Sequence, residues 1–316
     1  MRQHNFFLMF LKIVFFSAIL VSTSSARAEL KVVTTIKPLH SLIANVMDGV
    51  GEPALIIEGS TSPHSFTLKP SHAKLLEEAD IIFWIGEGIE TFMERPLESI
   101  VKNAEVVEFM EIESINKLKF REESSFEDHD DHDDHDDHDD HAGHEGHNHG
   151  EFDAHIWLDP MNAKEMVHEI AHELGDLDPA NKDKYEANAK ATIQALDQLV
   201  NDIDKGINKD AKFVVFHDAY QYFEERFGVR AAGALTLNTD VLPGAKQIAD
   251  IQDVIKDRGI KCIFSEPQFN PKIITTIAED MNIKTGVFDP LGANIDSNKS
   301  LYFKLITNLG DELKGC

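Results

Sequence analysis

A single long helical stretch constrains the fold more than any other feature of this sequence. It starts after Asp178-Pro179 and covers residues 181 to about 207. Apolar residues recur along it at helical spacing, at Ala189, Ile193, Leu196, Leu199, Val200 and Ile203. Helices in globular proteins average about 11–12 residues, so this one is unusually long. A helix of this length can bridge two lobes.

The segments on either side of this stretch alternate between strand and helix patterns. Before it, strands are expected at residues 30–35, 54–57, 81–85 and 106–109, and helices at residues 39–47, 71–79 and 89–101. A short extended piece at residues 154–158 and a helix at residues 161–174 lead into the long stretch. After it, strands are expected at residues 213–216, 231–237, 262–264 and 285–288, and helices at residues 219–227, 244–257, 271–281 and 299–313.

This alternation predicts an α/β fold with two lobes, each containing a mainly parallel four-stranded sheet, on either side of one long helix. We expect the first lobe to cover residues 29–177, the linker helix residues 178–207 and the second lobe residues 208–316. Ligands bind at the carboxyl ends of the strands in open α/β sheets. The expected binding site therefore lies in the cleft between the lobes.

The first 28 residues have the pattern of a secretory signal peptide. A basic start at Arg2 precedes an apolar run at residues 6–21, and Ala26-Arg27-Ala28 is a small-residue cleavage pattern. Lys12 leaves too short an apolar run to span a bilayer, and no Cys follows for lipid attachment. Cleavage after Ala28 is expected to release a soluble, exported protein that does not insert into the membrane.

An acidic, histidine-rich insert occupies residues 122–151 of the first lobe. It contains nine Asp and five Glu without Lys or Arg, so it should remain a solvated loop. Half of the sixteen histidines of the chain lie in it, at His129, His132, His135, His138, His141, His144, His147 and His149. A plain charged linker would not explain a histidine at every third position. Imidazoles and carboxylates at this density favour weak, reversible binding of divalent transition metals.

The chain has two cysteines, Cys262 and the C-terminal Cys316. In an oxidising compartment an even number of cysteines favours a disulfide over free thiols. The bond would tie the chain end to a strand, where termini otherwise fray. Thiolate metal ligands are the alternative, but two distant cysteines lack the paired spacing of a zinc knuckle.

Three histidines outside the insert stand where an extended segment gives way to a loop. They are His64 after the second strand, His155 in Asp153-Ala154-His155-Ile156-Trp157, and His217 at the end of a strand. Three neutral imidazoles and a water or carboxylate make a tetrahedral zinc site. Acceptors for the second ring nitrogens could come from Asp153, Asp159 and Asp218. Any one of these histidines could instead be a capping or core residue, but together they predict a metal site.

A second pattern points to a different function. His168, Glu169 and His172 match H-E-x-x-H, the helix signature of zinc metalloproteases. Helical periodicity argues against this alternative, because both histidines point away from the apolar face of residues 161–174. They are expected to be solvated.

Taken together, these residues resemble the zinc-specific periplasmic solute-binding proteins of bacterial ABC importers, the ZnuA-type branch of the cluster A-I metal-binding family. The likeness covers nearly the whole mature chain. It is carried by Pro63-His64, Lys69-Pro70-Ser71, the His-Asp insert, His155-Ile156-Trp157-Leu158, Phe216-His217-Asp218-Ala219-Tyr220, Glu266-Pro267-Gln268-Phe269, Asp289-Pro290-Leu291-Gly292 and the two cysteines.

The resemblance implies two α/β lobes joined by one long rigid helix, with a metal site between them. It also implies His64, His155 and His217 as zinc ligands and Asp289 as a fourth ligand or a residue behind the ligands. It also implies a periplasmic, monomeric carrier, not an enzyme, that delivers Zn²⁺ to the membrane permease of an ABC importer. The insert would then serve weaker metal capture or sensing. Because ligating imidazoles must be neutral, zinc affinity is expected to fall below about pH 6.

Two related functions remain alternatives at this point. Manganese- and iron-binding relatives tend to use a carboxylate where this chain has His217, so a third imidazole favours zinc. A metal-dependent adhesin would be compatible with the same fold. The formal net charge of −26 argues against nucleic acid as a partner, because phosphate binding requires clustered Lys and Arg.

Overall fold

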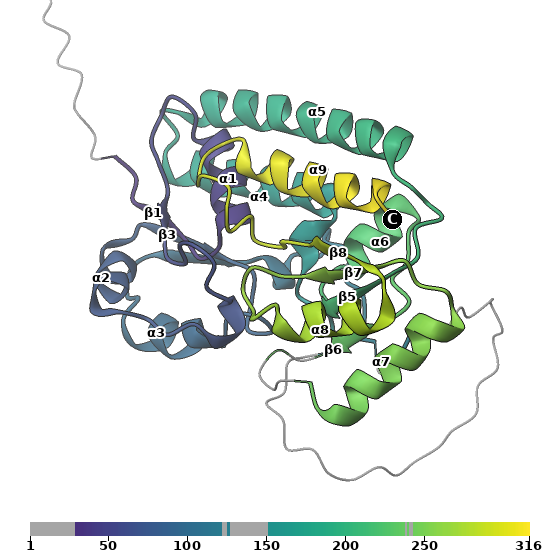
Figure 1. Ribbon diagram of the computed structural model, residues 1–316. Helices are drawn as coiled ribbons and strands as arrows, with labels where there is room; N and C mark the ends of the chain where they lie inside the picture. The colour runs from purple at the N-terminus through teal and green to yellow at the C-terminus, as the bar shows by residue number, and fades with distance from the viewer. Residues whose placement is uncertain (1–28, 122–124, 127–150, 238, 240–242) are drawn as a thin grey trace, which may run out of the picture.

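The fold contains two parallel four-stranded sheets with the same strand order (Figure 1). The computed structural model describes residues 29–121, 125–126, 151–237, 239 and 243–316. The sheet orders are β2-β1-β3-β4 and β6-β5-β7-β8, and every pair of neighbouring strands is parallel. The predicted α/β fold with two four-stranded parallel sheets is therefore confirmed.

The first sheet is built from short, mostly buried strands. They are β1 Val32–Thr34, β2 Ala54–Leu55, β3 Ile81–Trp84 and β4 Glu105–Glu108. The helices of this half are α1 Lys37–Val46, α2 Pro70–Glu78, α3 Glu94–Ser99 and α4 Pro160–Leu177. Pro38 in the first turn of α1 presets the helical φ angle, so the chain turns from strand to helix within a few residues of β1.

The second sheet repeats this arrangement after the long helix. Its strands are β5 Phe213–His217, β6 Ala234–Thr236, β7 Cys262–Ser265 and β8 Lys284–Val287, and its helices are α6 Gln221–Phe227, α7 Ala245–Asp257, α8 Lys272–Met281 and α9 Leu301–Lys314. Successive side chains of β5 point to opposite faces. Phe213 and Val215 join the main core, whereas Val214 and Phe216 pack in a second cluster that includes residues of α7 and α8.

The predicted long helix is α5, Lys182–Gly206. It does not bridge the halves through solvent. One face packs on α1, α4 and α9, and Figure 1 shows it running above α9 and α4. Tyr185, Ala189, Leu196 and Ile203 on that face are buried, which gives the helix most of its stability through an amphipathic contact.

One hydrophobic core runs through both halves of the chain. It contains Val32 and Leu39 from the beginning as well as Leu305 and Leu313 from the end. The last helix, α9, packs on both α1 and α5. The lobe boundaries at residues 177/178 and 207/208 remain a prediction.

Two local predictions of secondary structure were wrong. Residues 89–101 do not form one helix, because α3 starts only at Glu94, after a 3-10 turn. The Glu90 side chain accepts the backbone N–H groups of Ile85 and Gly86 and so fixes a turn there. Residues 154–158 are not extended, because residues 156–158 form a 3-10 turn.

The predicted disulfide joins Cys262 in β7 to Cys316 and ties the chain end to the second sheet. The predicted signal peptide and the eight histidines of the insert lie outside the described residues. No helix in the described part of the chain combines the length and apolar character needed to cross a membrane.

Candidate metal centre

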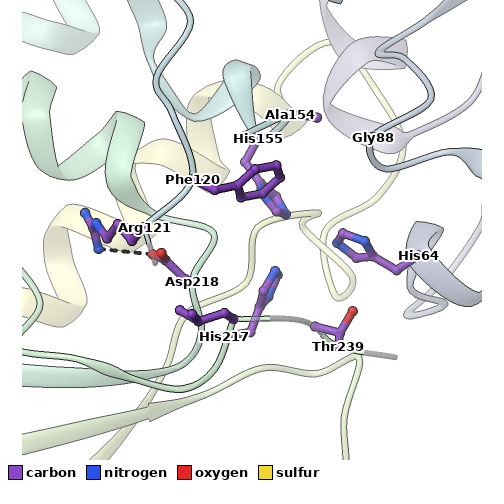
Figure 2. A pocket seen from close by; sticks show the side chains of 10 residues that line it. His64, Gly88, Phe120, Arg121, Ala154, His155, His217, Asp218 and Thr239 are labelled. Atoms are coloured by element: carbon purple, nitrogen blue, oxygen red, sulfur yellow. Dashed lines mark hydrogen bonds and ion pairs between the residues drawn. The ribbon is translucent and has the colours of Figure 1, made fainter. Parts of the chain in front are cut away.

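The three histidines predicted as metal ligands lie together (Figure 2). His64 lies in the 3-10 turn Pro63–Ser65 after β2, His155 immediately precedes the turn Ile156–Leu158, and His217 is the last residue of β5. One ring nitrogen from each lies within 4.8 Å of the other two. Among the described residues, no other group of three or more His, Cys, Asp or Glu side chains meets this criterion.

The rings of the three histidines form a compact triangle. The ring centroids of His64 and His155 are 5.5 Å apart, those of His64 and His217 are also 5.5 Å apart, and those of His155 and His217 are 4.9 Å apart. In Figure 2 the three side chains point into one common space from different segments. The first two come from the chain before α5 and the third from the chain after it, so the site requires both halves.

The register of two neighbouring strands places a carboxylate behind His217. In the parallel pair β5–β7, Val215 lies beside Phe264, so continuing the register brings His217 next to Glu266. The Nδ1 atom of His217 is 3.1 and 3.2 Å from the two carboxylate oxygens of Glu266. An acceptor at Nδ1 directs that nitrogen's proton to the carboxylate and leaves Nε2 to bind an ion.

The same contact changes the proton affinity of His217. Burial acts to lower the pKa of His217, but the negative charge and hydrogen bond of Glu266 outweigh it, and the pKa is raised above its ordinary value. A proton therefore competes with a metal ion for this imidazole.

His155 has an equivalent carboxylate supplied locally. Oδ1 of Asp153 accepts a hydrogen bond from the backbone N–H of His155 at 2.9 Å and lies 2.6 Å from its Nδ1 atom. The other carboxylate oxygen of Asp153 accepts a hydrogen bond from Nε2 of Gln221 at 2.6 Å. Asp153 is fully buried, and the ring of Trp157 packs 5.3 Å from the imidazole. These contacts fix the ring of His155 with its Nε2 atom available to a ligand.

A cavity of about 190 Å³ opens on one side of the triad. Besides the three histidines, its lining includes Phe120, Arg121, Ala154, Leu237 and Thr239. On the other side lies a void of only about 10 Å³, lined in part by Glu266, Pro290 and Leu291. A void of that size holds at most about a single water.

Arg121 forms a buried ion pair at the edge of this cavity. Its guanidinium donates to Asp218 Oδ1 at 3.0 Å and to Glu224 Oε2 at 2.7 Å. Burial raises the pKa of Asp218 to about 7, although the charge of Arg121 opposes this shift. Arg121 also lies over the ring of Phe126, 4.1 Å from its centroid, and so anchors the first part of the histidine-rich insert.

Of the three aspartates expected behind the ligands, only Asp153 contacts a histidine ring. Asp218 pairs with Arg121, and Asp159 caps α4 through the N–H of Met161 and pairs with Arg226. Sequence reasoning missed Glu266, although its position directly after the strand neighbouring β5 would have identified it once the strand order was known.

Asp289 lies in the loop after β8, and both of its carboxylate oxygens accept hydrogen bonds. Oδ1 accepts from Gln268 Nε2 at 3.0 Å and from the N–H of Leu291 at 3.2 Å, and Oδ2 accepts from the N–H of Ala293 at 2.6 Å. The group formed by the three histidines does not include Asp289. Its assignment as a fourth ligand or as a residue behind the ligands stays a prediction.

The H-E-x-x-H pattern does not form a centre of this kind. His168 and His172 are exposed on α4, and the nearest carboxylate of His172 is 3.8 Å away, on Asp176 one turn later. Helical periodicity predicted this exposure correctly, because α4 buries the opposite face with Met166, Val167 and Ile170.

Comparisons with known proteins agree with this geometry. Residues 32–316 match the family described as ZnuA, zinc-uptake complex component A, periplasmic. The high-affinity zinc uptake system protein ZnuA of Brucella abortus is 47% identical over 303 residues, covering 90% of this chain and 91% of that protein. A crystal structure of ZnuA superposes with a TM-score of 0.73 at 21% identity, over 90% of this chain and 98% of that one.

A further similar structure is the laminin-binding protein of Streptococcus agalactiae, described as bifunctional with adhesin and metal-transporting activity. Its TM-score is 0.70 at 25% identity, over 90% of this chain and 99% of that one. The match of the family over residues 32–316 covers both sheets, α5 and all three histidines. This chain is a member of the ZnuA family of periplasmic zinc-uptake components.

Proposed function

We propose that this protein captures Zn²⁺ in the periplasm with the imidazoles of His64, His155 and His217 and delivers it to the membrane permease of an ABC importer. The observation that carries the proposal is the group of three histidines whose ring nitrogens lie within 4.8 Å of one another. Two of these histidines, His155 and His217, have a carboxylate at the other ring nitrogen. Imidazole ligands backed by carboxylates are typical of zinc sites. The Brucella abortus relative is named as a high-affinity zinc uptake protein, which supports the same substrate.

The donor set favours zinc over harder divalent cations. Three nitrogen donors, which no carboxylate of the described residues joins, suit Zn²⁺ better than Mn²⁺, which prefers oxygen ligands. We propose that a water from the 190 Å³ cavity completes the tetrahedron and that Asp289 acts from behind by organising the loop on the opposite side. This arrangement keeps one coordination position exchangeable.

Membership of a family of zinc-uptake components confirms the expectation that the chain is not an enzyme. We propose further that the protein acts as a monomer, that the signal peptide is cleaved after Ala28, and that residues 29–177 and 208–316 form the two lobes joined at residues 178–207. The histidines between His129 and His149 would bind additional zinc weakly. The anchoring of Arg121 beside the cavity supports a role for this insert close to the entrance of the site.

Zinc stoichiometry of three purified proteins tests the proposal. The wild-type protein should bind one zinc tightly and several weakly, His217→Ala should lose only the tight one, and a deletion of residues 127–150 should lose only the weak ones. The deletion retains Phe126, whose N–H donates to the carbonyl of Ala232 at 3.0 Å, so the anchored segment is preserved. Retention of the tight zinc by His217→Ala would overturn the proposal.

Adhesion is a second candidate, favoured by one observation, the similarity to the laminin-binding protein of Streptococcus agalactiae. Binding of immobilised laminin by the zinc-loaded protein, measured against the metal-free protein, would support it. Absence of binding in both forms would leave zinc uptake as the single function.

A further inference from the structure

One face of α1 carries a polar stripe that binds the loop between β8 and α9. Lys37, Ser41 and Asn45 are spaced four residues apart, so they lie on one face of the helix. All three donate to backbone carbonyls of residues 292–299, which follow in the chain more than 250 positions later. This stripe joins a helix that precedes α5 to a segment that follows it.

Of these three residues, Lys37 makes the most hydrogen bonds to the loop. The ammonium group donates to the carbonyl oxygens of Gly292 at 2.7 Å, Ala293 at 3.0 Å and Ile295 at 2.6 Å. An ammonium has three N–H donors, so each can be satisfied by one of these oxygens. Lys37 is only 5% exposed, and burial lowers its pKa, while the charges of Asp289 and Asp296 oppose that shift.

The loop depends on this contact for its shape. Three carbonyl dipoles converge on one point, where they would repel one another without a cation between them. Gly292 has a φ of +66°, a left-handed conformation that a side chain would disfavour, and Asp289 secures the other side through the N–H of Ala293. Lys37 and Asp289 therefore hold the loop from opposite sides.

The same loop forms a wall of the metal centre. Pro290 and Leu291 line the 10 Å³ void together with the three histidines. The carbonyl of Pro290 accepts a hydrogen bond from Nε1 of Trp157 at 2.8 Å, and the ring of Trp157 packs against His155. Displacement of the loop would thus reach the ligands through Trp157.

We infer that Lys37 is a positioning residue that sets how long the site retains zinc, by fixing the 289–295 loop against the histidines and holding the two halves of the chain together. The inference rests on the proposed function, because it concerns zinc at the same triad. Lys37 touches no ligand, so its removal leaves the donor set intact and acts on the geometry that the donors need.

Zinc dissociation from Lys37→Met tests the inference. Full-length mature protein is loaded with one equivalent of Zn²⁺, which fills the tight site first, and is then mixed with excess chelator. Methionine keeps the apolar stem and removes three charge-assisted hydrogen bonds, so we expect zinc to leave at least about tenfold faster. The absorption spectrum of bound Co²⁺ should show the wild-type set of ligands.

Lys299→Met is the matched control. The ammonium of Lys299 pairs with Asp48 at 2.6 Å between the same two segments, but both side chains are about half exposed, at 51% and 54%. Exposed ion pairs contribute little, so dissociation should stay within about twofold of wild type. An equal acceleration in both variants would show a general weakening of the interface and would overturn the inference, as would a wild-type rate in Lys37→Met.

Chemical rescue separates positioning from loss of the fold. In Lys37→Ala, added methylammonium can occupy the space between the three carbonyls and should slow zinc release toward the wild-type rate, whereas tetramethylammonium, which has no N–H donor, should not. Equal effects of both salts would contradict the inference. If Lys37→Met does not fold, Lys37→Gln, which keeps N–H donors but loses the charge, must still accelerate release.

Different experimental results would overturn the proposed function and this inference. If wild-type protein binds no tight zinc, or if His217→Ala keeps it, the proposed function is wrong. If wild type holds zinc through His217 and Lys37→Met releases it at the wild-type rate, the inference alone is wrong.

Discussion

Nδ1 of His217 lies 3.1 Å from the carboxylate of Glu266, a residue that follows the neighbouring strand 49 positions later in the chain. Because β5 and β7 are parallel and in register, His217 at the end of β5 meets Glu266, the first residue after β7, at the carboxyl edge of the second sheet. The sheet therefore positions both the predicted ligand and the group that orients it.

We predict that Glu266→Ala weakens zinc binding by about 10–100-fold, the usual cost of removing a partner behind a metal ligand. Glu266→Gln should lose less, because its amide oxygen still accepts the Nδ1 proton of His217. Competition with a chromophoric chelator measures both dissociation constants. Glu279→Ala, on the exposed face of α8, is the control, and the prediction fails if Glu266→Ala matches it.

Zinc affinity is expected to fall as the pH is lowered, beginning at a higher pH than an ordinary histidine would cause. The pKa of His217 is raised by Glu266, so the metal-free site keeps its proton above the usual value of about 6.5. Affinity is full above the raised pKa and is lost as the pH falls through it. Calorimetric titration with zinc at several values between about pH 5 and pH 8 measures the affinity at each pH.

The same titration in Glu266→Gln should begin its loss at a lower pH, because the charge that raises the pKa of His217 is gone. An unchanged onset would show that Glu266 does not control the protonation of the site.

Glu90→Gln should make the metal-free protein more stable at neutral and alkaline pH. Burial raises the pKa of Glu90 to about 7 from an ordinary value of 4.5. A raised pKa means that the folded state binds the proton more tightly, so this contribution to stability is present below pH 4.5 and is lost as the pH rises through about 7. The difference between a pKa of 4.5 and a pKa of about 7 corresponds to about 3 kcal/mol in the free energy of unfolding.

Urea unfolding near pH 8 should therefore show a gain of about 1–3 kcal/mol for Glu90→Gln, and little change near pH 5. Glutamine preserves an oxygen acceptor for the N–H groups of Ile85 and Gly86. Glu279→Gln is the control for a change of charge alone. Equal stability changes at both pH values would refute the assignment.

Replacing Cys262 and Cys316 by Ser should lower the free energy of unfolding by about 4 kcal/mol, because the bond closes a loop across 54 positions of sequence. The bond restricts the conformational entropy of the unfolded chain, so its removal favours unfolding. Guanidinium unfolding of the variant against the wild type measures the difference. A loss below about 1 kcal/mol would mean that the surrounding packing already fixes the chain end.

The sequence predicted those features that depend on local pattern. Periodicity identified α5 within a residue or two of its ends, and strand alternation gave both parallel sheets. The rule that ligands gather at the carboxyl ends of parallel strands brought His64, His155 and His217 together, because each was expected near the end of an extended segment, although residues 156–158 form a 3-10 turn. The H-E-x-x-H alternative failed for an equally local reason, the exposed face of α4.

Features that depend on contacts between distant segments were not predictable. Glu266 was found only once the register of β5 against β7 was known, and the bonds of Lys37 join positions 255 to 258 residues apart. The turn at residues 156–158 was also missed, although the contact beside it is local: the Asp153 side chain accepts the N–H of His155 two residues later.

The packing of the last helix on the first has a consequence for biogenesis. Since α9 contacts α1 and closes the core shared by both sheets, a chain made and exported from its N-terminus cannot complete that core until its final 16 residues, 301–316, have arrived. The first half of the chain therefore lacks part of its packing until the last helix is in place.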